Sequence, residues 1–118
     1  MKLLNRSGLM LQPCQPYLDW INDLPTEVSE LEQPLAPGAL DGESRVYLIA
    51  EFEPDQSLGS LLSEQWQALF ENELSAWDEL GLHWPEAMSQ ELLQRWFEIK
   101  PLALAFDAET QPLMTATL

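Results

Sequence analysis

The fold of this chain is organised by residues 57–82, SLGSLLSEQWQALFENELSAWDELGL, in which apolar side chains recur at helical intervals. Steps of three and four residues place these side chains on one side of an α-helix, because successive residues turn by about 100°. The apolar stripe consists of Leu58, Leu62, Trp66, Leu69, Phe70, Leu74 and Trp77. Ser57 is suited to cap the start of the helix, and Gly81, followed by Pro85, is suited to end it. We therefore predict one long core helix against which the rest of the chain packs.

Shorter segments on both sides of this helix supply the other elements. Strands are expected at 7–12, 46–50 and 102–106, and helices at 16–24 and 89–100. The order strand-helix-strand-helix-helix-strand predicts an α/β or α+β fold, with one small sheet of about three strands and helices packed on it. The segment Val46–Ala50 is apolar at every position, which favours a strand that is central in its sheet or covered on both faces.

The length of 118 residues fits a single domain, and the chain contains no internal repeat. We expect residues 1–107 to form this domain and residues 108–118 to be a frayed tail. Residues 25–44 combine prolines, glycines and acidic residues, and we interpret them as a long acidic loop. Thr26 caps at most one helical turn within it. The expected role of the loop is a solvated, partly mobile connection, and the alternative is a binding loop.

The charge of the chain is strongly one-sided. It has 20 acidic and 5 basic residues, which gives a formal net charge of −15. Such a chain repels nucleic-acid backbones and anionic membrane surfaces, so we expect neither as a direct partner. A basic protein surface is the electrostatically matched partner, and self-association is the other option. The same imbalance lowers stability through self-repulsion.

Cysteine usage favours the cytoplasm. Cys14 is the only cysteine, so no disulfide can form within the chain, and a reducing compartment fits best. The apolar group near the N-terminus is interrupted by Asn5 and Arg6 and is too short for an export signal. No window approaches the roughly 18 apolar residues of a membrane span.

Three groups of residues carry a resemblance to a known family. They are Asn5-Arg6-Ser7-Gly8 leading to Gln15-Pro16-Tyr17-Leu18-Asp19-Trp20, then Val46-Tyr47-Leu48-Ile49, then Trp84-Pro85 with Arg95-Trp96-Phe97. Together they resemble a family of small acidic bacterial proteins without an assigned function, over a span from Asn5 to about Asp107. The shared residues are aromatic and apolar, so the resemblance implies packing and carries no activity, cofactor or site residue with it.

Signatures of catalysis and of metal binding are missing from the sequence. Cys14 and His83 are the only thiol and imidazole, and they fall on separate elements. Neither paired ligands for zinc, nor a calcium loop, nor a glycine-rich phosphate loop is present. We therefore assign no catalytic, cofactor-binding or metal-binding residue.

Glu73 is the one carboxylate within the apolar stripe, since it projects within about 20° of Leu62 and Trp77. The leading expectation is that Glu73 stays in water where the stripe runs past its cover, because unpaired charges are seldom buried. A second reading pairs it with an indole N–H group or with an arginine, Arg95 or Arg45. A third makes it a catalytic base with a perturbed pKa.

Surface residues supply the remaining candidates, all for partner binding. Glu64, Glu71 and Asp78 repeat every seven residues and predict an acidic stripe on the face of the core helix opposite the apolar one. Trp20 and Trp84 lie on a short helix and between two helices, where each could be a half-exposed anchor for another protein or a plug for the core.

These observations predict a non-enzymatic acidic protein-binding or regulatory module. One alternative is a nucleic-acid mimic that inhibits a DNA-binding protein, although a carboxylate stripe is several-fold less dense than the charge of duplex DNA, about one per 1.7 Å. The other alternative is an enzyme that uses carboxylates alone.

Overall fold

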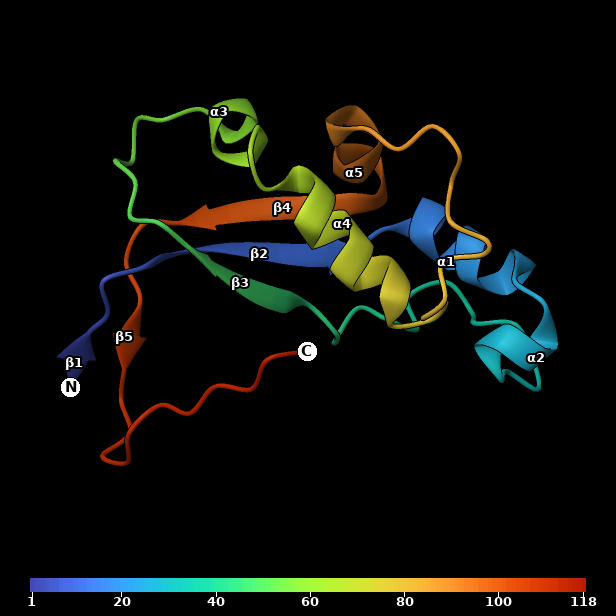
Figure 1. The fold of residues 1–118 in the computed structure, drawn as a ribbon, viewed down its shortest axis with the longest axis horizontal. Helices are drawn as coiled ribbons and strands as arrows, with labels where there is room; N and C mark the ends of the chain where they lie inside the picture. The colour runs from blue at the N-terminus through green and yellow to red at the C-terminus, as the bar shows by residue number, and fades with distance from the viewer.

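The structure is built on a three-stranded antiparallel sheet, shown in Figure 1, with the strand order β3-β2-β4. The computed structural model of the protein describes residues 1–118. The strands are β2 (Ser7–Pro13), β3 (Arg45–Ile49) and β4 (Phe97–Leu102). The central strand is β2, and its Leu9 and Leu11 are fully buried. A strand paired on both sides satisfies its backbone hydrogen bonds internally and can therefore lie in the core.

The remaining elements surround this sheet. A two-stranded ribbon pairs the start of the chain with its last strand, β1 (Lys2–Leu3) with β5 (Phe106–Asp107). The helices are α1 (Gln15–Asp23), α2 (Thr26–Ser29), α3 (Leu58–Leu62), α4 (Trp66–Ser75) and α5 (Gln90–Trp96). The predicted class, a small α/β fold with helices packed on a sheet, is confirmed. None of these helices has the length and apolar character needed to cross a bilayer.

One face of the sheet carries the core. Leu9 and Leu11 of β2 point towards α3, α4 and α5, which contribute Leu62, Phe70 and Leu93, all fully buried. The complete cluster is Leu9, Leu11, Tyr17, Leu18, Ile21, Leu40, Ile49, Leu62, Leu69, Phe70, Leu74, Leu93 and Phe97. The predicted apolar stripe therefore forms the interior, as its spacing indicated.

The single long helix predicted for residues 57–82 is wrong. Helix α3 ends at Leu62, and α4 runs only from Trp66 to Ser75. At the break, the Ser63 hydroxyl donates to the Ser60 carbonyl at 2.8 Å, a local bond of the kind that competes with helix formation. Glycine and serines also make residues 57–63 a weak helix former. Two short helices thus present the stripe to the core.

The predicted boundary between the last helix and the last strand is also wrong. Helix α5 ends at Trp96, and residues from Phe97 onwards form β4 instead of continuing the helix. Phe97 and Ile99 alternate with Glu98 and Lys100, and pairing with β2 supplies the hydrogen bonds that a longer helix would have made. Pro101 is accommodated because β4 is an edge strand. The predicted strand at 102–106 contributes only its two ends.

Strand β3 is not central, contrary to the expectation for Val46–Ala50. It forms one edge of the sheet, and Val46 and Leu48 are 58% and 51% exposed. Their apolar run indicated burial on both faces, yet helices cover only one face.

The loop at residues 25–44 is attached to the domain rather than free of it. It contains α2, its Leu40 is buried in the core cluster, and its Leu31 and Leu35 pack against that cluster. The Asn22 side chain accepts from the Leu35 amide at 2.8 Å and donates to the Leu35 carbonyl at 3.1 Å. Residues 108–118 contain no helix or strand, and their side chains are exposed.

Candidate functional site

Glu73 lies in the interior near the end of α4. Only 2% of the residue is exposed, so the expectation that it stays in water is wrong. Its carboxylate accepts a hydrogen bond of 2.7 Å from the Arg45 guanidinium on β3. The structure therefore has the second of the three arrangements considered, the pairing with an arginine. Arg45 is 28 positions away along the chain, so helical spacing alone could not identify it.

Two tyrosines and an asparagine complete the surroundings of this ion pair. The Tyr17 hydroxyl donates to the Glu73 backbone carbonyl at 2.6 Å, and the Asn72 amide donates to the Tyr47 hydroxyl at 2.9 Å. Burial raises the pKa of Glu73, and the charge of Arg45 only partly offsets the rise. Burial raises the pKa of Tyr47 to about 12 and also raises that of Tyr17. Glu73 is thus a carboxyl group whose proton is held more tightly than usual.

The geometry around Glu73 favours a structural role. The cavity that it lines with Tyr17, Arg45 and Trp77 has a volume of about 10 Å³. Such a volume is at the lower limit for a single water molecule. The ion pair joins β3 to α4, and Tyr17 joins α1 to the same helix. A second acid, Glu43, also lines this cavity, but no space for a substrate separates it from Glu73.

Asp78 organises the turn that follows α4. It is 2% exposed, so the prediction that it belongs to a hydrated acidic stripe is wrong. Its carboxylate accepts from the His83 backbone N–H at 2.7 Å, and the His83 imidazole lies 3.7 Å away. Bonds to a charged acceptor of this kind are stronger than neutral ones. We call residues 78–84 the Asp78 turn.

The two tryptophans proposed as anchors both bond to this turn. The Trp84 indole N–H donates to the Asp78 carbonyl at 3.0 Å, and the Trp20 indole N–H, from α1, donates to the His83 carbonyl at 2.9 Å. Both rings are half-buried against the core. Gly81 has φ +73°, a backbone conformation that favours glycine. Trp20 and Trp84 therefore stabilise the turn.

The Asp78 turn presents two leucines to solvent. Leu80 and Leu82 flank Gly81 and are 81% and 75% exposed. With α2 and the end of α4 they line an open groove of about 340 Å³. We call this the acidic groove; its lining residues are Glu27, Val28, Glu30, Ser75, Ala76, Trp77, Asp78, Glu79, Leu80 and Leu82. Five of its ten lining residues are apolar, four are acidic, and none is a lysine or an arginine.

The other two members of the predicted stripe lie apart from this groove. Glu64 lies in the break between α3 and α4, where it lines a different hollow with Phe52 and Leu61. Glu71 is half-buried on α4. The break in the helix and the burial of Asp78 thus divide the stripe, and the expected continuous face of carboxylates does not form.

Several lining residues of the groove were not singled out from the sequence. The sequence contains a signal for Leu80 and Leu82. These two leucines flank Gly81 at the predicted end of the helix, beyond the apolar stripe that forms the core. Glu27 and Glu30 come from a segment distant in sequence, and only the folded chain brings them to the turn. No three His, Cys, Asp or Glu side chains converge in the structure as metal ligands.

Comparisons with known proteins found no match to this chain among family models, curated proteins or solved structures.

Proposed function

We propose that this protein is a non-enzymatic, cytoplasmic binding module that recognises a basic, amphipathic segment of another protein in the acidic groove. The observation that carries this proposal is the exposure of Leu80 and Leu82 beside Glu27, Glu30 and Glu79. Apolar side chains held in water and bordered by charge of one sign are typical of an interaction site.

The apolar part of the groove supplies the contact area. Trp77 is half-buried where it lines the groove, and the two leucines that line it are exposed. Burial of a leucine side chain contributes about 1.5–3 kcal/mol to association, before the cost of ordering the partner is subtracted. A ligand with one or two aliphatic side chains therefore fits this surface.

The acidic part determines which ligand is favoured. Four acidic residues line the groove without a lysine or arginine, in a chain whose net charge is −15: Glu27, Glu30, Asp78 and Glu79. Lysine or arginine side chains beside the aliphatic ones complement this charge, and the field of the whole protein accelerates their approach. An acidic or nucleic-acid ligand would be repelled.

The turn is preorganised for such binding. The buried carboxylate of Asp78 and the indole N–H groups of Trp20 and Trp84 hold residues 78–84 through main-chain hydrogen bonds. A rigid turn loses little conformational entropy when a partner binds, which favours affinity.

The experiment measures binding of a synthetic amphipathic helix of leucine and lysine by titration calorimetry. We expect the double variant Leu80→Ser/Leu82→Ser to bind roughly tenfold or more weakly, because it removes the apolar contact and keeps every charge. The control Val46→Ser/Leu48→Ser removes two exposed apolar side chains from the sheet instead and should bind as the wild type does. Affinity should also fall between about 50 and 300 mM salt.

A peptide with serine in place of leucine separates specific from purely ionic binding. It keeps the positive charge and should bind weakly to both the wild type and the double variant. Equal affinity of the leucine-lysine peptide for the wild type and for Leu80→Ser/Leu82→Ser would refute the groove as its site.

A further inference from the structure

The hydrogen-bond pattern of the sheet shows which main-chain groups of β3 face its free edge. The Cys14 amide donates to the Trp96 carbonyl at 2.9 Å and so extends the ladder between β2 and β4 by one pair. In an antiparallel ladder, hydrogen-bonded pairs alternate with non-bonded pairs. Even-numbered residues of β2 therefore bond to β4, and odd-numbered residues bond to β3. The β3 residues that bond to β2 are Arg45, Tyr47 and Ile49.

Val46 and Leu48 consequently direct their N–H and C=O groups to the free edge of β3. Neither residue takes part in a main-chain hydrogen bond outside the ladder with β2. Residues 46–49 contain neither a charge nor a proline that would block the edge. Only an extended strand presents N–H and C=O groups at the intervals that this edge requires. The ligand that matches the edge is therefore a stretch of polypeptide in β conformation.

The opposite edge of this sheet, on β4, is protected against a further strand. By the same alternation, the residues of β4 that turn their main chains outwards are Phe97, Ile99 and Pro101. Pro101 has no N–H group to donate, and a proline on an edge strand is a usual device against strand addition. The three-stranded sheet is therefore open to addition at β3 only.

The segment after β5 has the composition of such a strand. Residues 110–118, TQPLMTATL, contain no charged side chain, although the chain as a whole has a net charge of −15. They make no main-chain hydrogen bond, and the apolar side chains of Leu113, Met114 and Leu118 are exposed. Their three threonines favour an extended backbone. The tail thus has unpaired backbone and apolar side chains to bury, and it brings no negative side chain to an acidic protein.

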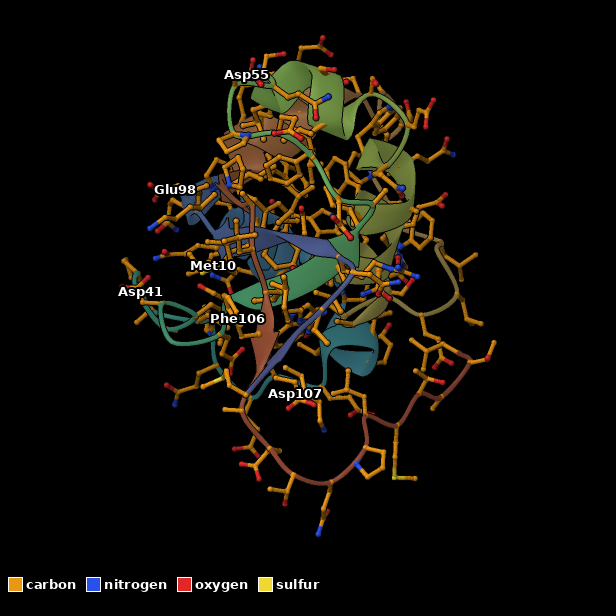
Figure 2. The ribbon with its side chains drawn as sticks, turned by 90° about the vertical axis from the view of Figure 1, so that its left-hand side faces the viewer. Met10, Asp41, Asp55, Glu98, Phe106 and Asp107 are labelled. Atoms are coloured by element: carbon orange, nitrogen blue, oxygen red, sulfur yellow. The ribbon has the colours of Figure 1, made fainter.

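The fold tethers this tail close to the free edge of β3. Asp107 pairs with Lys2 in the β1–β5 ribbon. Lys2 is at most about 18 Å from Ser7, which pairs with Ile49 of β3. Residues 108–118 extend for up to about 36 Å, so they reach the edge from the ribbon. In Figure 1 the chain turns back after β5 and runs below β3 in the opposite direction, and Figure 2 shows this loop below Asp107, clear of the sheet.

We propose that the free edge of β3 is a strand-addition site and that residues 112–118 of the same chain occupy it as a fourth, antiparallel strand. The tether favours this strand over a free one, because it raises the effective concentration of the tail at the edge. Tail residues opposite Val46 and Leu48 share the outer face of the sheet with them and extend its apolar surface. Strand addition involves no residue of the acidic groove. The tail residues placed on the outer face are Met114, Ala116 and Leu118.

Amide hydrogen exchange of the full chain, measured residue by residue by NMR, tests the proposal. The Val46 and Leu48 amides should exchange at least about tenfold more slowly in the wild type than in Ala116→Pro, because that variant loses an N–H group that faces β3. The matched control Gln111→Pro introduces the same residue just before the added strand, beside Pro112, and should retain the protection. Both positions are exposed and lie outside the helices and strands, so the rest of the fold should be unaffected.

Three outcomes would overturn the proposal. Equally fast exchange of Val46 and Leu48 in the wild type and in Ala116→Pro would mean that no strand occupies the edge. Protection that persists in Ala116→Pro would assign the edge to a strand other than the tail. Protection that increases with protein concentration would mean that the tail of one copy pairs with β3 of another, contrary to pairing within one chain.

Discussion

Glu73 of α4 connects three elements in the interior, because it is bonded to Arg45 of β3 and to Tyr17 of α1. Its carboxylate is 2% exposed and is held by Arg45 at 2.7 Å, while its backbone carbonyl accepts from Tyr17. Burying a carboxylate costs free energy that one ion pair seldom restores in full. The raised pKa of Glu73 reflects this balance, since burial outweighs the attraction of Arg45. The residue is therefore a source of pH dependence rather than a simple gain in stability.

The substitution Glu73→Gln tests whether the buried carboxyl group makes the stability of the protein depend on pH. Burial raises the pKa of Glu73 above its ordinary value of 4.5, so the folded protein retains a proton that the unfolded chain has already lost. The contribution of Glu73 to stability is therefore fully present below about pH 4.5 and declines as pH rises through the folded pKa, by about 1.4 kcal/mol for each unit of the shift. We expect urea unfolding to show that Glu73→Gln becomes progressively more stable relative to the wild type as pH rises. The control Glu71→Gln removes a charge from the same helix and should not reproduce the trend; a pH-independent difference for Glu73→Gln would contradict the prediction.

The elements are short and depend on contacts with distant parts of the chain. Near its C-terminus, α4 leaves the Glu73 carbonyl without its usual partner, because the Trp77 N–H bonds to Leu74 instead. The Tyr17 hydroxyl of α1 takes that place at 2.6 Å. In the following turn, the Asp78 carboxylate and the Trp84 indole bond main-chain groups of the turn itself, and the Trp20 indole of α1 donates to the His83 carbonyl. Helix α1 therefore supplies a hydrogen bond to the end of α4 and another to the turn that borders the acidic groove.

The substitution Tyr17→Phe tests how much the Tyr17 hydroxyl stabilises the end of α4. The ring keeps its contacts with Phe97 and Trp20, but the buried Glu73 carbonyl loses its donor, which should lower the free energy of unfolding by about 1–2 kcal/mol. Ser63→Ala is the control, because the Ser63 hydroxyl also donates to a main-chain carbonyl, that of Ser60, but at an exposed position where water can replace it. Urea unfolding of both variants measures the difference. Equal losses would mean that the Tyr17 hydroxyl does not specifically stabilise the end of α4.

At the scale of the whole molecule, charge is distributed unevenly over two apolar surfaces. The acidic groove has carboxylates without a lysine or arginine, whereas the outer face of the sheet, where Figure 2 shows Met10 and Glu98 away from α4, carries one anion, Glu98, and one cation, Lys100. Four of the five cations lie on the sheet or at its β1–β5 end: Lys2, Arg6, Arg45 and Lys100. The negative charge of the chain is therefore concentrated on surfaces other than the outer face of the sheet.

Salt should also raise the stability of the folded monomer. A net charge of −15 places many carboxylates close together in the folded chain, and added ions screen their repulsion. We expect the Tm from differential scanning calorimetry to rise between about 20 and 150 mM sodium chloride. A Tm that does not change with salt would contradict the prediction.

What the sequence by itself determined is the set of features that depend on local pattern. The apolar periodicity identified Leu62, Leu69, Phe70 and Leu74 as core, and Ser57 and Ser89 cap helices as predicted, with bonds to Ser60 and Leu92. Composition alone set the negative charge. These properties follow from side-chain spacing and local hydrogen bonding, which act over a few residues.

Only the tertiary structure decided the features that need a partner from elsewhere in the chain. Phe97–Leu102 is a strand because it pairs with β2, and Glu73 is buried because Arg45 of β3 forms an ion pair with it. The turn after α4 is held by Trp20, whose indole N–H donates to the His83 carbonyl 63 positions away, and this turn exposes Leu80 and Leu82. The physical reason is common to all three: the free energy of a long-range hydrogen bond or ion pair can exceed local helix propensity, and neither residue of such a pair identifies the other in the sequence.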